Sequence, residues 1–157
     1  MRGLSRREFA FQRALTRLVG APYRFGGRSR AGIDCSSLIV RGIRETLRVN
    51  VAKLPWMTAD QLGKGYRGIT QATHDPDSGC RCTLAFFDWD EDSIYEHAAI
   101  RLLDNSWMWA SSSVGKVVRI DPSSEVIWRR QWREIEGALD GKRSALRVVD
   151  WSAVQAF

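Results

Sequence analysis

The sequence predicts an α+β fold in which N-terminal helices pack on a central antiparallel β-sheet. Apolar residues recur at helical spacing through most of the first third of the chain. From Thr83 onward, short apolar runs alternate with turn residues, which is typical of β-strands. Helices followed by strands, with no internal repeat and no linker, indicate one α+β domain spanning residues 1–157.

The first predicted helix covers residues 6–19. Ser5 is its predicted N-cap, and Glu8 three residues later completes a capping box. Gly20 ends the helix, and Pro22 follows at the offset expected after a helix C-terminus.

A second predicted helix begins at Cys35, directly after a loop rich in glycine and arginine, and continues to Arg48. Asp34 or Ser36 is expected to cap it. A helix N-terminus presents unpaired N–H groups and a partial positive charge, so this position is expected to lower the pKa of the Cys35 thiol. A short third helix is predicted to start near Thr58.

The strands follow a polar, turn-rich segment, residues 69–82, which is predicted to be an exposed loop. A turn is predicted at residues 104–106, and residues 126–135 are predicted to form a short helix or strand. The predicted strands occupy residues 83–89, 97–103, 107–112, 116–120 and 145–149.

The chain is basic, with a net charge of +6 and a pI of about 9.7. Such a surface attracts polyanions. No run of Lys and Arg is long enough to form a nucleic-acid-binding arm, so no specific nucleic-acid partner is expected. The first 20 residues carry charges throughout and lack the apolar core of a signal peptide. No stretch approaches the length of a transmembrane segment. We therefore expect synthesis in the cytoplasm without a signal peptide.

The three cysteines cannot all pair, which favours a reducing compartment and leaves Cys35 free to react. Cys80 and Cys82 are too close in sequence for an easy disulfide. Neither a metal nor a cofactor is expected, because no zinc-ligand spacing fits the potential ligands His74, Asp75, Asp77, Cys80 and Cys82.

Two histidines are available as a base for Cys35. His74 lies in the polar loop, whereas His97 opens a predicted strand. In papain-like enzymes an early cysteine on a helix meets a later histidine on a strand, and Cys35 with His97 has that order. Taken separately, a buried cysteine and a histidine at a strand start are more often packing residues. The segments around them favour catalysis.

These segments resemble the NlpC family of cell-wall cysteine peptidases. Residues 20–27 (GAPYRFGG) resemble its G-x-P-Y-x-W-G-G motif, and residues 32–38 (GIDCSSL) resemble G-x-D-C-S-G-L. Less specific matches follow in the family's order at residues 54–61, 84–87, 97–100 and 110–113.

The resemblance implies a papain-like NlpC fold and hydrolysis of an amide bond in the peptidoglycan stem peptide, commonly between D-glutamate and diaminopimelate. It implies that Cys35 attacks the carbonyl and that His97 is the general base. The Cys35 N–H and the Tyr23 hydroxyl are expected to face the oxyanion. The residues assigned to substrate binding are Gly26, Gly27, Asp34, Ser36, Trp56, Trp109 and Ser111.

Trp109 departs from the family pattern. The family usually has a polar residue, often histidine, just before its Ala-Ser-Ser run, and that residue orients the catalytic imidazole. An indole N–H donates but cannot accept a hydrogen bond. A backbone carbonyl or Ser111 then takes over, or the site is a Cys–His dyad, or the enzyme is weak or inactive.

The charge and the signal-free start favour a phage lysin, a tail-associated peptidase or an antibacterial effector. Such a protein acts at the bacterial cell wall after release or delivery, and its basic surface meets anionic cell-wall or outer-membrane polymer. One alternative is a related cysteine amidase or acyltransferase. Another is a catalytically degenerate wall-binding or virion structural module. Nucleic-acid binding rests on the charge alone.

Overall fold

The computed structural model describes residues 2–47, 53–73, 80–120 and 144–157. Its helices are α1 (Arg2–Thr16), α2 (Cys35–Leu47), α3 (Ala59–Gly63), the 3₁₀ helix η2 (Tyr66–Gly68) and α5 (Trp151–Gln155). Its strands are β1 (Arg28–Ser29), β2 (Gly32–Ile33), β3 (Thr70–Ala72), β4 (Thr83–Phe87), β5 (His97–Arg101), β6 (Trp107–Ser111), β7 (Lys116–Ile120) and β8 (Ser144–Val149).

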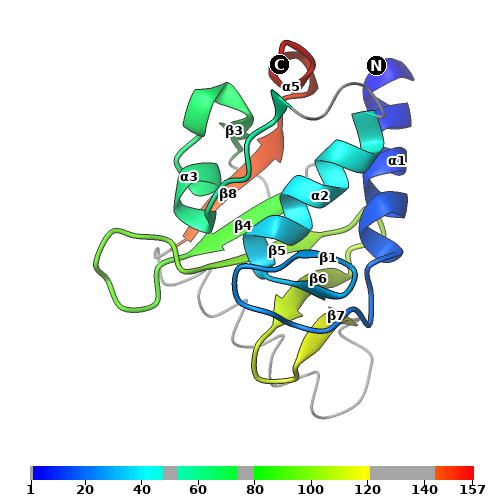
Figure 1. Ribbon diagram of the computed structural model, residues 1–157. Helices are drawn as coiled ribbons and strands as arrows, with labels where there is room; N and C mark the ends of the chain where they lie inside the picture. Colours follow the sequence, from blue (N-terminus) through cyan, green and yellow to red (C-terminus); the bar gives the residue numbers. More distant parts are fainter. Residues whose placement is uncertain (1, 48–52, 74–79, 121–143) are drawn as a thin grey trace.

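Six strands form one antiparallel sheet in the order β3-β8-β4-β5-β6-β7, and β1 pairs with β2 in a separate short hairpin (Figure 1). The helices precede most of the sheet in the chain and lie against it, so the predicted α+β fold is confirmed. The last strand, β8, lies between β3 and β4 rather than at an edge.

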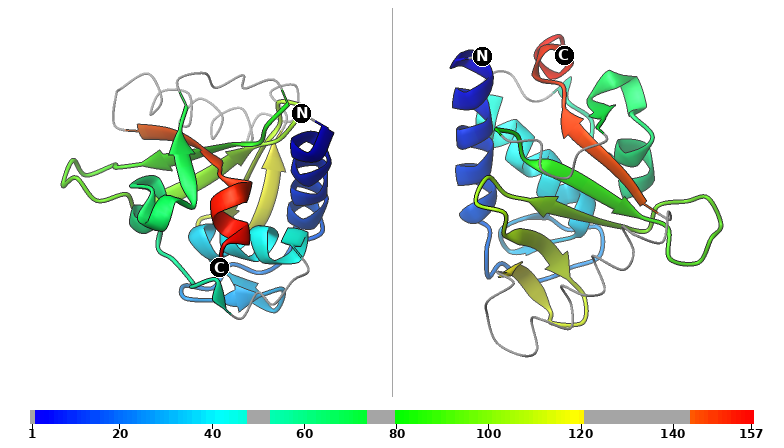
Figure 2. Two further views of the ribbon diagram at one scale, coloured as in Figure 1. Left: turned by 90° about the horizontal axis from the view of Figure 1, so that it is seen from above. Right: turned by 180° about the vertical axis from the view of Figure 1, so that it is seen from behind.

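Helix α2 packs on β5 and β6, and α1 lies alongside α2 (Figure 2). The two helices come close because Gly42 of α2 has no side chain: a Cβ there would lie 2.7 Å from Leu15 and 2.9 Å from Phe11. This contact fixes α1 against α2, which itself packs on the sheet. Within the described residues, no helix is long and apolar enough to cross a membrane.

The strands bury apolar side chains on both faces of the sheet. Alternation along β5 sends Ala98 and Ile100 into the main core beneath the helices, and Ala99 to a second apolar cluster on the other face. The second cluster consists of Ala85, Phe87, Ala99, Trp107, Trp109, Val118 and Ile120. His97 begins β5 two residues before Ala99, so its side chain starts on the same face as this cluster.

Several predicted boundaries were wrong. Helix α1 begins at Arg2, so Ser5 lies inside the helix and is not its N-cap. The helix ends at Thr16 and a turn leads to Gly20, whose φ is +86°. The segment predicted as a loop contains β3, which pairs with β8. Residues 126–135 lie outside the described residues.

Glu8 faces the protein interior instead of capping α1. It is fully buried. Burial raises the pKa of its carboxyl from 4.5 to about 7, although the nearby charge of Arg81 and polar groups of Cys82 and Trp151 offset part of this effect. The folded protein therefore holds Glu8 more readily as the neutral acid than the unfolded chain does.

We expect Glu8→Gln to remove a pH-dependent loss of stability. Because the folded pKa is raised, Glu8 opposes folding little below pH 4.5 and increasingly as the pH rises through 7. A shift of this size corresponds to about 3 kcal/mol of unfolding free energy. Urea unfolding at pH 5 and pH 8 measures the free energy of unfolding. Relative to the wild type, that of the variant should be higher at pH 8 than at pH 5. A control at the partly exposed Glu45, Glu45→Gln, is expected to change by less than about 0.5 kcal/mol.

Candidate active site

Cys35 is the first residue of α2, at the point where the glycine-rich loop becomes a helix. The carboxylate of Asp34 caps this helix by accepting hydrogen bonds from the Ser37 N–H (2.9 Å) and the Ser36 hydroxyl (3.2 Å). Its second oxygen accepts from the Gly26 N–H at 3.0 Å. Asp34 therefore fixes both the helix start and the loop that faces the thiol.

A cavity of about 340 Å³ opens beside Cys35. Four segments line it: the loop from Tyr23 to Arg28, the start of α2, the stretch that leads into α3, and the two residues before β5. The cavity brings together six of the residues predicted for the site, namely Tyr23, Gly26, Asp34, Cys35, Ser36 and Trp56. The Cys35 thiol thus opens into a space large enough for part of a peptide.

The thiol lies against the backbone at the start of β5. Strands β5 and β6 pair at Ile100↔Met108 and Arg101↔Trp107. Toward the start of β5, the Cys35 Sγ lies 4.0 Å from the Glu96 carbonyl oxygen, and the Ala98 N–H donates toward the sulfur.

Burial is the largest influence on the thiol and raises the pKa of Cys35 to about 11. The backbone N–H groups of Ala98, Ser36 and Cys35 lower it, and the Asp34 charge raises it further. The expectation that the helix N-terminus leaves a low thiol pKa was therefore wrong, because desolvation outweighs the helix N–H groups. The Cys35 side chain is therefore a neutral thiol at neutral pH.

The His97 imidazole lies in an aromatic cluster. It stacks on Trp89 (ring centroids 4.8 Å apart) and on Phe87 (5.8 Å), and it meets Trp109 edge-on at 6.5 Å. Burial lowers the pKa of His97 to about 4, so the ring is neutral at neutral pH. Among the described interactions, no hydrogen bond joins this ring to Cys35. The structure brings the His97 backbone to the thiol, while packing orients the imidazole.

Trp109 and Ser111 lie on β6, outside the lining of the cavity. Trp109 contacts the imidazole through ring packing. The Ser111 hydroxyl lies 3.1 Å from the Ser113 hydroxyl and accepts a hydrogen bond from the Val114 N–H. It therefore stabilises the β6–β7 turn. Gly27 is also outside the lining, and its missing side chain lets it approach the Gly32 carbonyl, which a Cβ would meet at 2.3 Å.

Tyr23 lines the cavity next to the thiol. Burial raises the pKa of its hydroxyl, and the charges of Cys35 and Asp34 raise it further. The hydroxyl therefore stays protonated and available as a donor. This is the position expected of a group that stabilises negative charge near Cys35.

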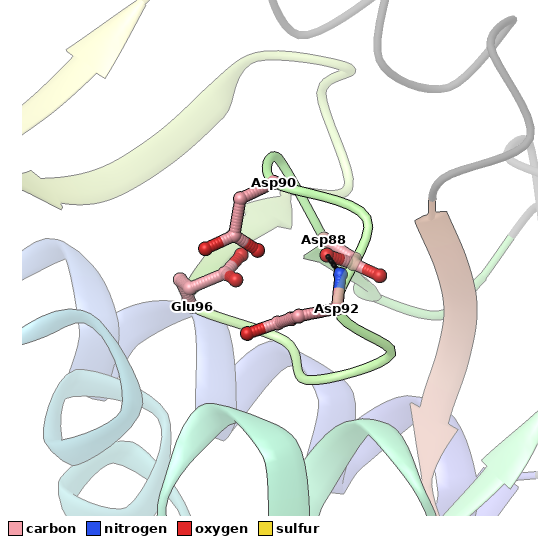
Figure 3. A group of neighbouring side chains, drawn as sticks. All are labelled: Asp88, Asp90, Asp92 and Glu96. Carbon is pink, nitrogen blue, oxygen red and sulfur yellow. Dashed lines mark hydrogen bonds between the residues drawn. The ribbon is translucent and has the colours of Figure 1, made fainter.

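The loop between β4 and β5 gathers four carboxylates that sequence reasoning did not single out. The side chains of Asp88, Asp90, Asp92 and Glu96 lie together (Figure 3), with one oxygen of each within 4.8 Å of the others. Asp88 accepts from the Asp92 N–H, and a hydrogen bond with Asp90 is the main cause that raises the pKa of Glu96. Of the four, Glu96 also lines the cavity, so this loop places one carboxyl group at the cavity's edge.

Two further neighbours of the site were also missed. Trp89 comes from the same loop, is 56% exposed and stacks on His97. Arg28 lines the cavity directly after the Gly-Gly pair. The sequence signals were present, since Trp89 lies between two acidic residues shortly before His97, and Arg28 follows a motif already recognised. The sequence alone does not show, for either residue, in which direction the side chain points.

Alkylation of Cys35 by iodoacetamide is expected to be slow at neutral pH. With a pKa of about 11, about one thiol in 10⁴ is ionised at pH 7, and the rate should rise about tenfold per pH unit toward 11. Mass spectrometry in a Cys80→Ser background measures the rate without interference from the exposed Cys80. A rate that is already maximal at pH 6 would contradict the neutral-thiol description.

A cysteine at a helix N-terminus, set against a strand that begins with histidine, is the arrangement of the papain-like cysteine hydrolases. A sequence model described as the NlpC/P60 family matches residues 20–136. The chain belongs to this family, which is a family of cysteine peptidases.

Curated relatives and solved structures agree with this assignment. The chain is 30% identical to "Murein DD-endopeptidase MepS/Murein LD-carboxypeptidase" of Escherichia coli strain K12, over 76% of this chain and 57% of that protein. It is 31% identical to "Probable endopeptidase NlpC" of the same strain, over 72% of this chain and 66% of that protein. The chain thus spans between about half and two thirds of the length of these relatives.

Among solved structures, the NlpC/p60 domain of the peptidoglycan hydrolase SagA has a TM-score of 0.53 at 19% identity, covering 91% of this chain and 98% of that chain. The peptidoglycan hydrolase RipB of Mycobacterium tuberculosis also has a TM-score of 0.53, at 23% identity, covering 80% of this chain and 63% of that chain. These likenesses establish the fold.

Proposed function

We propose that this protein hydrolyses an amide bond in the peptidoglycan stem peptide, between D-glutamate and diaminopimelate, with Cys35 as nucleophile. The observation that carries the proposal is the Cys35 thiol at the start of α2, opening into a cavity of peptide size. The printed names of the relatives, murein endopeptidases and peptidoglycan hydrolases, support the substrate class.

In the proposed reaction, substrate binding turns the neutral His97 imidazole away from Phe87 and Trp109, on whose face of the sheet it lies in the structure, and toward the neutral thiol. His97 takes the thiol proton as Cys35 Sγ bonds to the scissile carbonyl carbon. The Cys35 N–H and the Tyr23 hydroxyl donate to the oxyanion. The C–N bond then breaks, His97 protonates the leaving amine, and a water molecule activated by His97 hydrolyses the thioester.

Because both groups rest neutral, proton transfer accompanies attack and no stable thiolate–imidazolium pair forms beforehand. Trp109 supplies no acceptor for the imidazolium. We propose that the site acts as a Cys–His dyad, and that Phe87, Trp89 and Trp109 hold the imidazole before the substrate binds. In unliganded sites such catalytic hydrogen bonds are often long, and they tighten in the substrate complex.

Defined muropeptides test the bond that is cleaved. The panel contains a disaccharide tripeptide, a disaccharide tetrapeptide and a cross-linked dimer, with products identified by liquid chromatography and mass spectrometry. Release of a diaminopimelate-containing fragment from the D-glutamyl residue supports the proposal. Cleavage of the terminal D-alanine or of the cross-link would instead match the activities in the MepS name. No cleavage of any member would contradict it.

Two other functions use the same residues differently. A related cysteine amidase or acyltransferase would use the same Cys35 and His97, and its products would appear with acyl donors rather than wall fragments. A degenerate wall-binding or virion structural module is favoured by Trp109 at the position of the usual polar residue. It would bind sacculi equally well after Cys35→Ala and show no turnover.

We also propose that the protein acts at the bacterial cell wall after release or delivery, as a phage lysin, a tail-associated peptidase or an antibacterial effector does. The net charge of +6 supports this, because it favours contact with anionic cell-wall or outer-membrane polymer. Binding to sacculi that weakens steeply with added salt would fit this electrostatic contribution.

A further inference from the structure

Arg28 is a positively charged residue that lines the cavity beside the Cys35 thiol. It belongs to β1, and its backbone is held by pairing with Ile33 of β2. The Arg28 carbonyl also accepts a hydrogen bond from Arg41 of α2 at 3.3 Å. The side chain therefore starts from a fixed point on a paired hairpin that is joined to the catalytic helix.

The guanidinium of Arg28 is oriented by an aromatic ring. Its central carbon lies 5.1 Å from the centre of the Trp56 ring, and Trp56 lines the same cavity. Arg44 also packs on Trp56, at 4.8 Å, but it donates to the Leu54 carbonyl at 2.9 Å and does not line the cavity. Stacking satisfies the face of a guanidinium and leaves its N–H edge available for a planar anion.

The two carboxylates that line the cavity have other partners. Asp34 accepts from Gly26, Ser36 and Ser37, and Glu96 accepts from the Trp89 N–H. Within the described residues, no ion pair joins either of them to Arg28. Arg28 is exposed, its guanidinium is oriented by Trp56, and its N–H groups are available to donate to an anion.

We infer that Arg28 binds the free α-carboxylate of the D-glutamyl residue of the peptide substrate, next to the amide bond that Cys35 attacks. Both residues line one cavity of about 340 Å³, so a carboxylate bound by Arg28 and the scissile carbonyl lie in the same cavity. The planar fork of arginine matches a carboxylate through two parallel hydrogen bonds. The inference rests on the proposed function for the identity of the peptide, and it makes Arg28 a specificity-determining residue.

The test compares two stem tripeptides that differ at one group: the α-carboxyl of the D-glutamyl residue is free in one and amidated in the other. Binding is measured by isothermal titration calorimetry on Cys35→Ala protein, so that no turnover interferes. We expect tighter binding of the free acid. In the Cys35→Ala protein, the second substitution Arg28→Gln should weaken binding of the free acid about 10- to 100-fold. It should leave the affinity for the amidated peptide within about twofold.

The matched control is Arg30→Gln, which removes an exposed arginine of the same hairpin that does not line the cavity. It should leave both affinities within about twofold and thereby exclude a general effect of net charge. Equal weakening of acid and amide by Arg28→Gln, or equal affinities of the Arg28 protein for both peptides, would overturn the inference. Because binding is read without hydrolysis, failure of the proposed reaction appears separately in the muropeptide assay.

Discussion

Replacing Cys35 by alanine is expected to abolish amide hydrolysis, with kcat reduced by about 10³-fold or more. The thiol is the proposed attacking group, and the cavity beside it contains no second thiol among its described lining residues. Removal of a covalent nucleophile typically costs this much or more, because the remaining groups only polarise and orient the substrate. Initial rates on the preferred muropeptide, followed by chromatography, measure the loss.

Two controls separate loss of chemistry from loss of structure. Cys82→Ala removes a buried thiol elsewhere in the core, so it reports on core packing and should retain most activity per folded molecule. Near-ultraviolet circular dichroism of Cys35→Ala should match the wild type, since Cys35 is only partly buried. Activity of Cys35→Ala within tenfold of the wild type would remove the cysteine from the mechanism.

Replacing His97 by glutamine is expected to lower kcat by about 10²- to 10⁴-fold with a smaller change in KM. A positioned general base contributes about this factor, and here the thiol cannot ionise unaided because its pKa is about 11. Glutamine keeps a planar polar side chain among the aromatic rings but cannot exchange a proton at neutral pH. Steady-state kinetics over a range of substrate concentrations separates kcat from KM.

The pH profile distinguishes a base from a packing residue. His97 must be neutral to accept a proton, and its folded pKa is lowered to about 4. The kcat/KM of the wild type should therefore fall as the pH drops through about 4, and this limb should be absent from the residual activity of His97→Gln. If the limb persisted unchanged in the variant, His97 would have a structural role and another group would be the base.

The sequence predicted helix α2 well because local signals agreed there. The Gly-rich loop ends just before Cys35, the capping residue Asp34 precedes it, and apolar residues at helical spacing follow it. The helix starts at that residue. The short helix predicted to start near Thr58 also depends on local signals: α3 begins at Ala59, after a capping box formed by Thr58 and Gln61. At Ser5 the same kind of signal was misleading, because Glu8 turns into the core and the helix extends past the presumed cap.

Features that depend on pairing between distant segments were not predictable. Strand β3 has three residues, two of them exposed, and it exists through its pairing with β8 nearly 80 positions away. The hairpin β1–β2 has two residues in each strand. The acidic loop and the stacking of Trp89 on His97 depend on how residues 88–96 fold back, which alternation of apolar residues does not encode.

The balance of charge and burial at Cys35 could not be read from the sequence either. A helix N-terminus favours the thiolate, and that favourable part is present as N–H groups aimed at the sulfur. The pKa that results at Cys35 also depends on how closely α2 packs on β5 and β6, which the sequence does not specify. The cation–aromatic contact between Arg28 and Trp56 likewise joins two segments that the sequence keeps 28 positions apart.

The most direct test of the central claim is incubation of purified diaminopimelate-type peptidoglycan with wild type and with Cys35→Ala, followed by mass spectrometry of the soluble peptides. A stem-peptide hydrolase that uses Cys35 predicts that the wild type releases peptides cut at one amide bond and that the variant releases none. Release of no peptide by correctly folded wild-type protein, or equal release by both proteins, would contradict it.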